Sequence, residues 1–200
     1  MKEGFFAASL AFALGLPLAA RAADLQRAEE SVGGRCFLCH GMEGEAASAL
    51  YPRLAGQNAD YIARQLGDFK SGRRKSETMA GMVDELTPEE MKSLGAFFQK
   101  KPATRSEAGD ADLAGVGRYI FVKGNPFSGV AACVSCHGTK GHGTPQLPRL
   151  AGQQPLYLEN QLKQFNTRER NNDNAVMHSI AAKLTELEVK AVSSYLSTLE

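Results

Sequence analysis

The chain has 200 residues, and its 23 lysine and arginine side chains are balanced by 22 aspartate and glutamate side chains, for a formal net charge of +1. This balance argues against nucleic-acid binding and against strong long-range steering of a charged partner. The length suffices for two small domains.

The first residues predict a secretory signal peptide over 1–22. Lys2 is followed by an apolar run from Phe5 to Ala20, and Ala20-Arg21-Ala22 supplies small residues for cleavage after Ala22. An uncleaved membrane anchor is the alternative, but the run is short for a spanning helix, which needs about 20 apolar residues. No other stretch of the sequence is apolar and long enough to span a bilayer. We therefore expect export to the periplasm.

Each half of the chain predicts three helices around long loops, and no segment has the alternating pattern of a strand. Opening helices are expected near residues 24–35 and 110–123. Middle helices are expected near 58–70 and 154–167. A final helix closes each half, and its apolar residues stand at helical spacing, so the sequence predicts an all-α protein.

The start of each closing helix carries a capping signal. Thr87-Pro88-Glu89-Glu90 places a threonine cap, a proline in the first helical position and a glutamate three residues after the cap. Thr185-Glu186-Leu187-Glu188 repeats the pattern without the proline. Both closing helices should therefore begin directly after a threonine.

All four cysteines lie in two Cys-Xaa-Xaa-Cys-His motifs, at residues 36–40 and 133–137. This motif is the attachment signature of a c-type haem, in which both thiols bond to the porphyrin and the histidine binds the iron. Two disulfides or one zinc site are alternatives. Neither accounts for the histidine that follows each pair. We therefore expect two covalently bound haem c groups, on Cys36, Cys39, Cys133 and Cys136.

The two halves are copies of one another. Pro-Arg-Leu-Ala-Gly-Gln occurs at 52–57 and again at 148–153, and Tyr61 and Gln65 recur as Tyr157 and Gln161. The separation between the two segments is much longer than the period of a solenoid, which is about 20–50 residues. The repeated unit is therefore a whole domain.

A polar segment with proline and glycine separates the copies, as an inter-domain linker does. We place the first domain at 23–101, the linker at 102–111 and the second domain at 112–200.

The histidine of each motif, His40 or His137, is the expected proximal ligand of the iron. Met79 and Met177 stand at matching places before the closing helices and are the expected sixth ligands. Such His/Met ligation raises the reduction potential. The rival residues are Met42, Met82, His142 and His178. The two rival methionines lack a methionine partner in the second copy, and we expect both rival histidines at the surface.

Further polar groups are candidates for supporting roles. The carbonyl of Pro52 or Pro148 is expected to accept a hydrogen bond from the ligating histidine of its own half, because such histidines donate their second ring N–H to an oxygen. Basic residues in two loops could approach haem propionates or a partner, although a solvated loop is the expected role for most: Arg73, Arg74, Lys75, Arg168 and Arg170.

With both motifs, both Pro-Arg-Leu-Ala-Gly-Gln segments and both methionines, the chain resembles the cytochrome c4 family over its whole mature length. The resemblance implies two tandem class I cytochrome c domains related by pseudo-twofold symmetry. It also implies a periplasmic electron carrier, in some cases peripherally attached to the membrane, that serves terminal oxidases.

We therefore expect a monomeric electron carrier and not an enzyme, with redox protein partners such as a bc1-type complex as donor and a terminal oxidase as acceptor. The carrier would shuttle single electrons in a bacterial respiratory chain. A dihaem peroxidase would need one iron with an open coordination position. With a histidine and a methionine bound to each iron, no such position remains. The main alternative is the dihaem subunit of a periplasmic flavocytochrome dehydrogenase, whose ligands would look the same.

Overall fold

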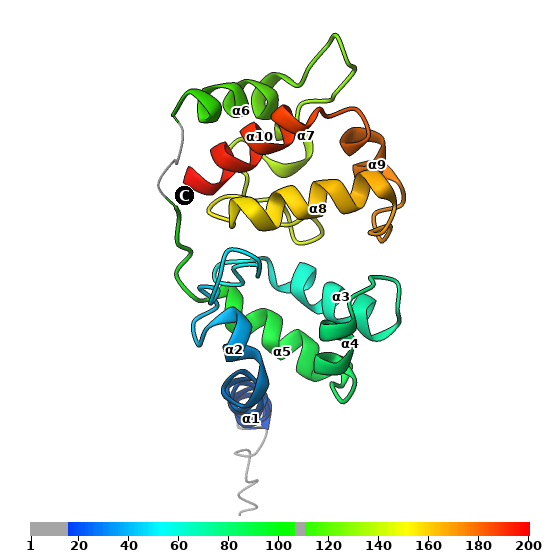
Figure 1. Cartoon of the computed structure of the whole chain (residues 1–200). Helices are drawn as coiled ribbons and strands as arrows, with labels where there is room; N and C mark the ends of the chain where they lie inside the picture. The colour runs from blue at the N-terminus through cyan, green and yellow to red at the C-terminus, as the bar shows by residue number, and fades with distance from the viewer. Residues whose placement is uncertain (1–15, 107–110) are drawn as a thin grey trace, which may run out of the picture.

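The computed structural model describes residues 16–106 and 111–200, and its described part consists of helices joined by long loops. It contains no β-strand in these ranges, which confirms the all-α expectation; two isolated backbone bridges pair Arg74 with Arg170 and Asn125 with Val130. The helices form two bodies stacked on one another, one from each half of the chain (Figure 1).

The first half begins with α1 (Leu16–Ser31), which runs directly into a π-helical turn, η1 (Val32–Cys36), and the short helix α2 (Phe37–His40). The middle helix α3 (Ala59–Lys70) is followed by the short α4 (Glu77–Val83). The closing helix α5 (Pro88–Gln99) packs against α1 and α3.

The second half repeats this order. Its helices are α6 (Ala111–Lys123), α7 (Val134–His137), α8 (Pro155–Thr167), α9 (Val176–Ala181) and α10 (Glu186–Thr198). Helix α10 packs against α6 and α8. The middle helices α3 and α8 face each other between the two bodies (Figure 1).

Both predicted capping boxes are present. The Thr87 and Thr185 hydroxyls accept hydrogen bonds from the backbone N–H of Glu90 and Glu188, whose carboxylates bond back to the cap residues. Burial raises the pKa of Glu188, but hydrogen bonds from Thr185 and Asn125 outweigh it and hold that pKa below its usual value. These contacts fix where each closing helix begins.

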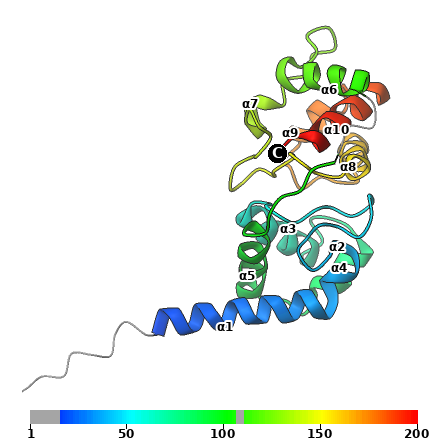
Figure 2. The ribbon, with the colours of Figure 1, turned by 90° about the vertical axis from the view of Figure 1, so that its left-hand side faces the viewer.

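Two sequence features lie at the edge of the described residues. Residues 1–15 of the expected signal peptide and residues 107–110 of the expected linker lie outside them. Helix α1 extends from the first body and continues through Ala22, the expected cleavage residue (Figure 2). In the part of the chain that the structure describes, no helix has the length and apolar character needed to cross a bilayer.

A glycine allows two helices of the second half to pack closely. A Cβ atom at Gly117 of α6 would collide with the carbonyl oxygen of Ala191 on α10. Gly115, two residues earlier on the same helix, is exposed and has no neighbouring atom within 4 Å of its Cβ position.

We expect Gly117→Ala to lower the free energy of unfolding by about 2 kcal/mol, because the added methyl group forces the two backbones apart. The control Gly115→Ala should raise it by up to about 1 kcal/mol, since alanine favours the helix. Urea denaturation of the haem-loaded protein measures both changes. Equal stabilities of the two variants would contradict the close helix contact.

Candidate haem sites and the contact between the halves

The first motif is folded as one tight helical turn. Cys36 ends the π-helical turn η1, and Cys39 and His40 lie in α2. Gly41 then leaves the helix with φ +77° and donates its N–H to the Phe37 carbonyl at 2.9 Å. A glycine takes this backbone conformation without strain. Because Cys39 and His40 follow Cys36 by three and four residues in helical backbone, the three residues share one face of this short segment.

The second motif has the same local shape. Cys133 precedes α7, and His137 ends it. Gly138 follows with φ +79° and donates its N–H to the Val134 carbonyl at 3.0 Å. The main local difference lies in the segment before the motif. The first motif continues from α1 without a break, whereas a loop separates α6 from the second motif.

Both motif histidines are held in the orientation that an iron ligand needs. The Nδ1 atom of His40 lies 3.0 Å from the Pro52 carbonyl oxygen, and that of His137 lies 3.3 Å from the Pro148 carbonyl oxygen, as the sequence predicted. Both rings are buried, with 8% and 6% exposure. Burial lowers the pKa of each ring despite the carbonyl contact, which favours the neutral imidazole. With Nδ1 donating to proline, the lone pair of Nε2 is available to a metal.

No disulfide joins the four cysteines, and all four side chains are free thiols. The Cys36 thiol donates to the Ser31 carbonyl oxygen at 3.4 Å, and burial raises its pKa. Burial raises the pKa of the Cys133 thiol to about 11. Among the described residues, no group of three or more histidine, cysteine, aspartate or glutamate side chains is arranged to hold a metal ion.

The two expected methionine ligands occupy equivalent short helices. Met79 lies on α4, which packs against α3, and Met177 lies on α9, which packs against α8. Both side chains are half-buried, whereas the rival methionines Met42 and Met82 are exposed. The matched placement agrees with a shared role, and the ligand assignment stays a prediction.

The two other histidines differ from each other. His142 is exposed and its ring bonds to the backbone oxygen of Glu200 at 2.6 Å, as expected for a surface residue. His178 is half-buried, and its Nδ1 lies 2.9 Å from the Phe165 carbonyl oxygen. The surface position expected for His178 was therefore wrong. It stays the alternative to Met177 as a ligand in the second half.

The donor set fits a haem in each half. Two free thiols and a buried neutral imidazole lie on one turn, which is what covalent attachment and proximal ligation require. Half-buried leucines also pack on the core at matching places in the two halves, namely Leu54 with Leu150 and Leu66 with Leu162. Such positions offer apolar contact to a porphyrin.

Comparison with known proteins agrees with this geometry. A family model described as cytochrome c matches residues 121–200, which include the second motif. Cytochrome c4 of Thiocapsa roseopersicina is 40% identical over 88% of this chain and 93% of its own length. A crystal structure of reduced recombinant cytochrome c4 from Pseudomonas stutzeri matches 88% of this chain and 98% of that chain at 32% identity, with a TM-score of 0.83. The thiosulfate dehydrogenase electron acceptor of Stutzerimonas stutzeri is 36% identical over 94% of this chain and 91% of its own length.

The chain belongs to the cytochrome c4 family. It therefore consists of two tandem cytochrome c domains, takes two haem c groups and is an electron-transfer cytochrome. The expected fold class and cofactors are confirmed.

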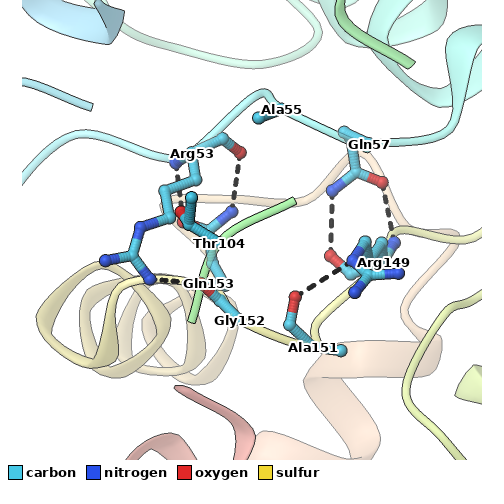
Figure 3. Close-up of a pocket in the computed structure, with 8 residues that line it drawn as sticks. All are labelled: Arg53, Ala55, Gln57, Thr104, Arg149, Ala151, Gly152 and Gln153. Carbon is cyan, nitrogen blue, oxygen red and sulfur yellow. Dashed lines mark hydrogen bonds between the residues drawn. The ribbon is translucent and has the colours of Figure 1, made fainter. Parts of the chain in front are cut away.

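In this member of the family, the two Pro-Arg-Leu-Ala-Gly-Gln segments bind each other across the halves (Figure 3). The Gln153 side chain accepts from the Arg53 backbone N–H at 2.7 Å and donates to the Arg53 carbonyl at 3.0 Å. The Gln57 side chain makes the same pair of bonds with the Arg149 backbone, at 2.7 and 2.8 Å. Each glutamine side chain thus binds the backbone of the other segment. Such a reciprocal contact is typical of twofold symmetry.

A second reciprocal contact buries two arginines between α3 and α8. Arg74 donates to Tyr157 at 2.9 Å and Gln161 at 2.7 Å in the opposite half. Arg170 donates to Tyr61 at 3.0 Å and Gln65 at 3.1 Å.

Each of these arginines also lies over an aromatic ring of its own half, Arg74 over Phe69 and Arg170 over Phe165. Burial acts to lower the pKa of Arg74, but the Tyr157 and Tyr61 phenols raise it overall. Arg74 and Arg170 are buried, whereas Arg73, Lys75 and Arg168 are exposed, as the sequence predicted for most of this basic set. The repeated tyrosine and glutamine, four residues apart in both middle helices, were the sequence signal for this contact.

One charged group in this contact is not repeated. Asp68 is buried, pairs with Arg73 and accepts from the Asn172 amide at 2.7 Å across the halves. The matching position in α8 is the neutral Gln164. The two halves therefore differ by one buried carboxylate and by Asn172, which also donates to Gln65.

We expect Arg170→Ala to lower the free energy of unfolding by about 2–3 kcal/mol, because it removes a buried side chain together with its hydrogen bonds to Tyr61, Gln65 and Gln161. Arg118→Ala on the exposed face of α6 is the matched control, with an expected change within about 0.5 kcal/mol. Urea unfolding followed by circular dichroism measures both. A loss no larger than that of the control would contradict a structural role for the buried arginine.

Proposed function

We propose that the protein carries single electrons in the periplasm, within a bacterial respiratory chain, toward a terminal oxidase. The observation that carries this proposal is the duplicated site: each half holds a buried histidine against a proline carbonyl and places a half-buried methionine on an equivalent short helix. Haem iron closed by histidine and methionine changes its oxidation state and leaves no open position for a substrate.

In this proposal each site residue has one role. Cys36 and Cys39 attach one haem, and Cys133 and Cys136 attach the other. His40 and His137 are the proximal ligands, and Met79 and Met177 are the sixth ligands. The chain's own contribution is to orient the imidazoles, hold them neutral and cover the porphyrins with apolar side chains.

The proposed compartment is the periplasm. The apolar run and small residues at the N-terminus support export with cleavage after Ala22. Covalent haem attachment in bacteria takes place outside the cytoplasmic membrane, which agrees with export. The proposed domains are 23–101 and 112–200, joined by the linker 102–111. The exported protein is proposed to be a monomer that can attach peripherally to the membrane. A bc1-type complex is the proposed donor and a terminal oxidase the acceptor.

A second function has one specific observation in its favour. A relative that aligns over 94% of this chain is named a thiosulfate dehydrogenase electron acceptor. This supports a periplasmic dehydrogenase as the electron donor, either as a transient partner or as a subunit of the same complex. The alternative flavocytochrome subunit would copurify with a flavin protein, and the carrier would not.

An optical redox titration of the purified, exported protein tests the proposal. Two low-spin haems that titrate as one-electron steps at positive potentials are the expected result, because methionine ligation favours ferrous iron. A high-spin haem, or one that titrates at strongly negative potential, would contradict methionine as the sixth ligand in that half. An enzymatic function would then have to be tested again.

Met79→Ala should lower the potential of one haem only and remove its low-spin spectrum, because the thioether ligand is lost. Met82→Ala is the control on the same short helix, since Met82 is exposed, and it should leave both potentials unchanged. Met177→Ala should affect the other haem alone. If its spectrum and potential stay at the wild-type values, His178 becomes the sixth ligand to test.

A further inference from the structure

In the second half, a histidine and a glutamine bind the two polar groups of a single peptide unit. The Pro148 carbonyl oxygen lies 3.3 Å from Nδ1 of His137, and the Arg149 N–H donates to Oε1 of Gln57 at 2.7 Å. This carbonyl and this N–H belong to the same planar peptide unit. Gln57 comes from the first half, so one half binds the peptide that holds the imidazole of the other half (Figure 3).

The first half has the same arrangement with the roles of the halves exchanged. The Pro52 carbonyl oxygen lies 3.0 Å from Nδ1 of His40, and the Arg53 N–H of the same peptide unit donates to Oε1 of Gln153 at 2.7 Å. Gln153 belongs to the second half. Each motif histidine is therefore connected, through one peptide unit, to a side chain of the opposite half.

Each glutamine is fixed in place by its own half. Oε1 of Gln57 also accepts from the Asn58 N–H at 3.0 Å, and the Gly56 N–H donates to the Phe98 carbonyl in α5 at 2.9 Å. The equivalent bonds of the second half, both 2.9 Å long, run from Gln154 to Gln153 and from Gly152 to Leu196 in α10. The closing helix of each half thus holds the segment from which the glutamine reaches across.

The connection lies away from water. Gln57 and Gln153 are each 5% exposed, and the two histidines are buried as well. Hydrogen bonds in series polarise one another, and they do so more strongly where the surroundings are apolar. When the Arg149 N–H donates to Gln57, the carbonyl of the same peptide becomes a stronger acceptor for the Nδ1–H of His137.

A stronger acceptor at Nδ1 changes the imidazole as a metal ligand. A hydrogen bond from the second ring N–H to an oxygen raises the basicity of a ligating histidine. A more basic ligand stabilises ferric iron relative to ferrous iron, and such hydrogen bonding is one of the ways in which a protein sets a haem potential. The cross-half glutamine bond therefore acts to lower the potential.

We propose that Gln57 and Gln153 are positioning residues that tune the haem of the opposite half, each by polarising the peptide unit that binds the motif histidine there. The inference rests on the proposed roles of His40 and His137 as proximal ligands. It makes each half a part of the iron environment of the other, so that neither half sets its own potential alone.

The test uses Gln57→Met and Gln153→Met in the exported, haem-loaded protein. Methionine has nearly the length of glutamine, carries no N–H and is only a weak acceptor. A redox titration followed by NMR resolves the two haems. The same spectra of the fully reduced protein report the Nδ1 proton of each ligating histidine.

We expect Gln57→Met to raise the potential of the haem in the second half only. The equilibrium constant for its reduction should rise about threefold, which corresponds to about 28 mV for a one-electron couple. The Nδ1 proton of His137 should move upfield, because its hydrogen bond weakens. Gln153→Met should do the same to the haem and to His40 of the first half.

The crossed pattern separates tuning from a loss of structure. Both glutamine variants weaken the same contact, so a general loosening of the halves would affect the same haems in both variants. Arg64→Met is the control, because it removes a bond across the halves to the Gln146 carbonyl at 2.6 Å that reaches neither peptide unit. It should leave both potentials and both Nδ1 protons unchanged.

Three results would overturn the inference: unchanged potentials in both glutamine variants, a shift confined to the haem of the mutated half, or equal shifts of both haems in both variants. If Gln57→Met does not fold, Gln153→Met tests the equivalent connection. A wild-type protein without two low-spin haems would instead contradict the proposed carrier function, and the inference would fall with it. Two low-spin haems that neither glutamine variant shifts would contradict the inference alone.

Discussion

In each half, one short connection joins the motif histidine to the contact between the halves, and the rest of the structure depends on it. Each motif histidine bonds to a proline carbonyl, and the next residue along the chain is the arginine whose backbone is bound by the glutamine of the other half. The orientation of an iron ligand and the contact between the halves are therefore set by adjacent peptide groups. A disturbance of the contact therefore reaches the imidazole through a single residue.

This connection also accounts for the mixture of symmetry and asymmetry in the molecule. Groups that bind across the halves occur in both copies, because a twofold contact needs the same residues from each side. Groups outside the contact are free to differ, as Glu43 and Lys140 do. The buried Asp68 against Gln164 is an intermediate case, because it lies beside the reciprocal network and accepts a hydrogen bond across the halves from Asn172.

The sequence predicted the features that depend on local chemistry. The attachment motifs, the threonine caps and the proline carbonyls all act within about a dozen residues of their partners, and all lie where they were expected. The burial of Arg74 and Arg170 was missed, because a basic loop looks solvated until a second body covers it. The half-burial of His178 was missed for a different reason, since no sequence motif marks the Phe165 carbonyl in α8 as the partner of its ring.

The reciprocal contact has the form of a homodimer interface contained in one polypeptide. A true homodimer must present the same surface at both of its ends, because symmetry makes every mutation appear twice. Fusion of the two copies removes that constraint and keeps the partners together at high effective concentration. The surface of one half can then change while the residues of the shared contact stay the same. A symmetric pair of domains can in this way become a molecule whose two ends differ.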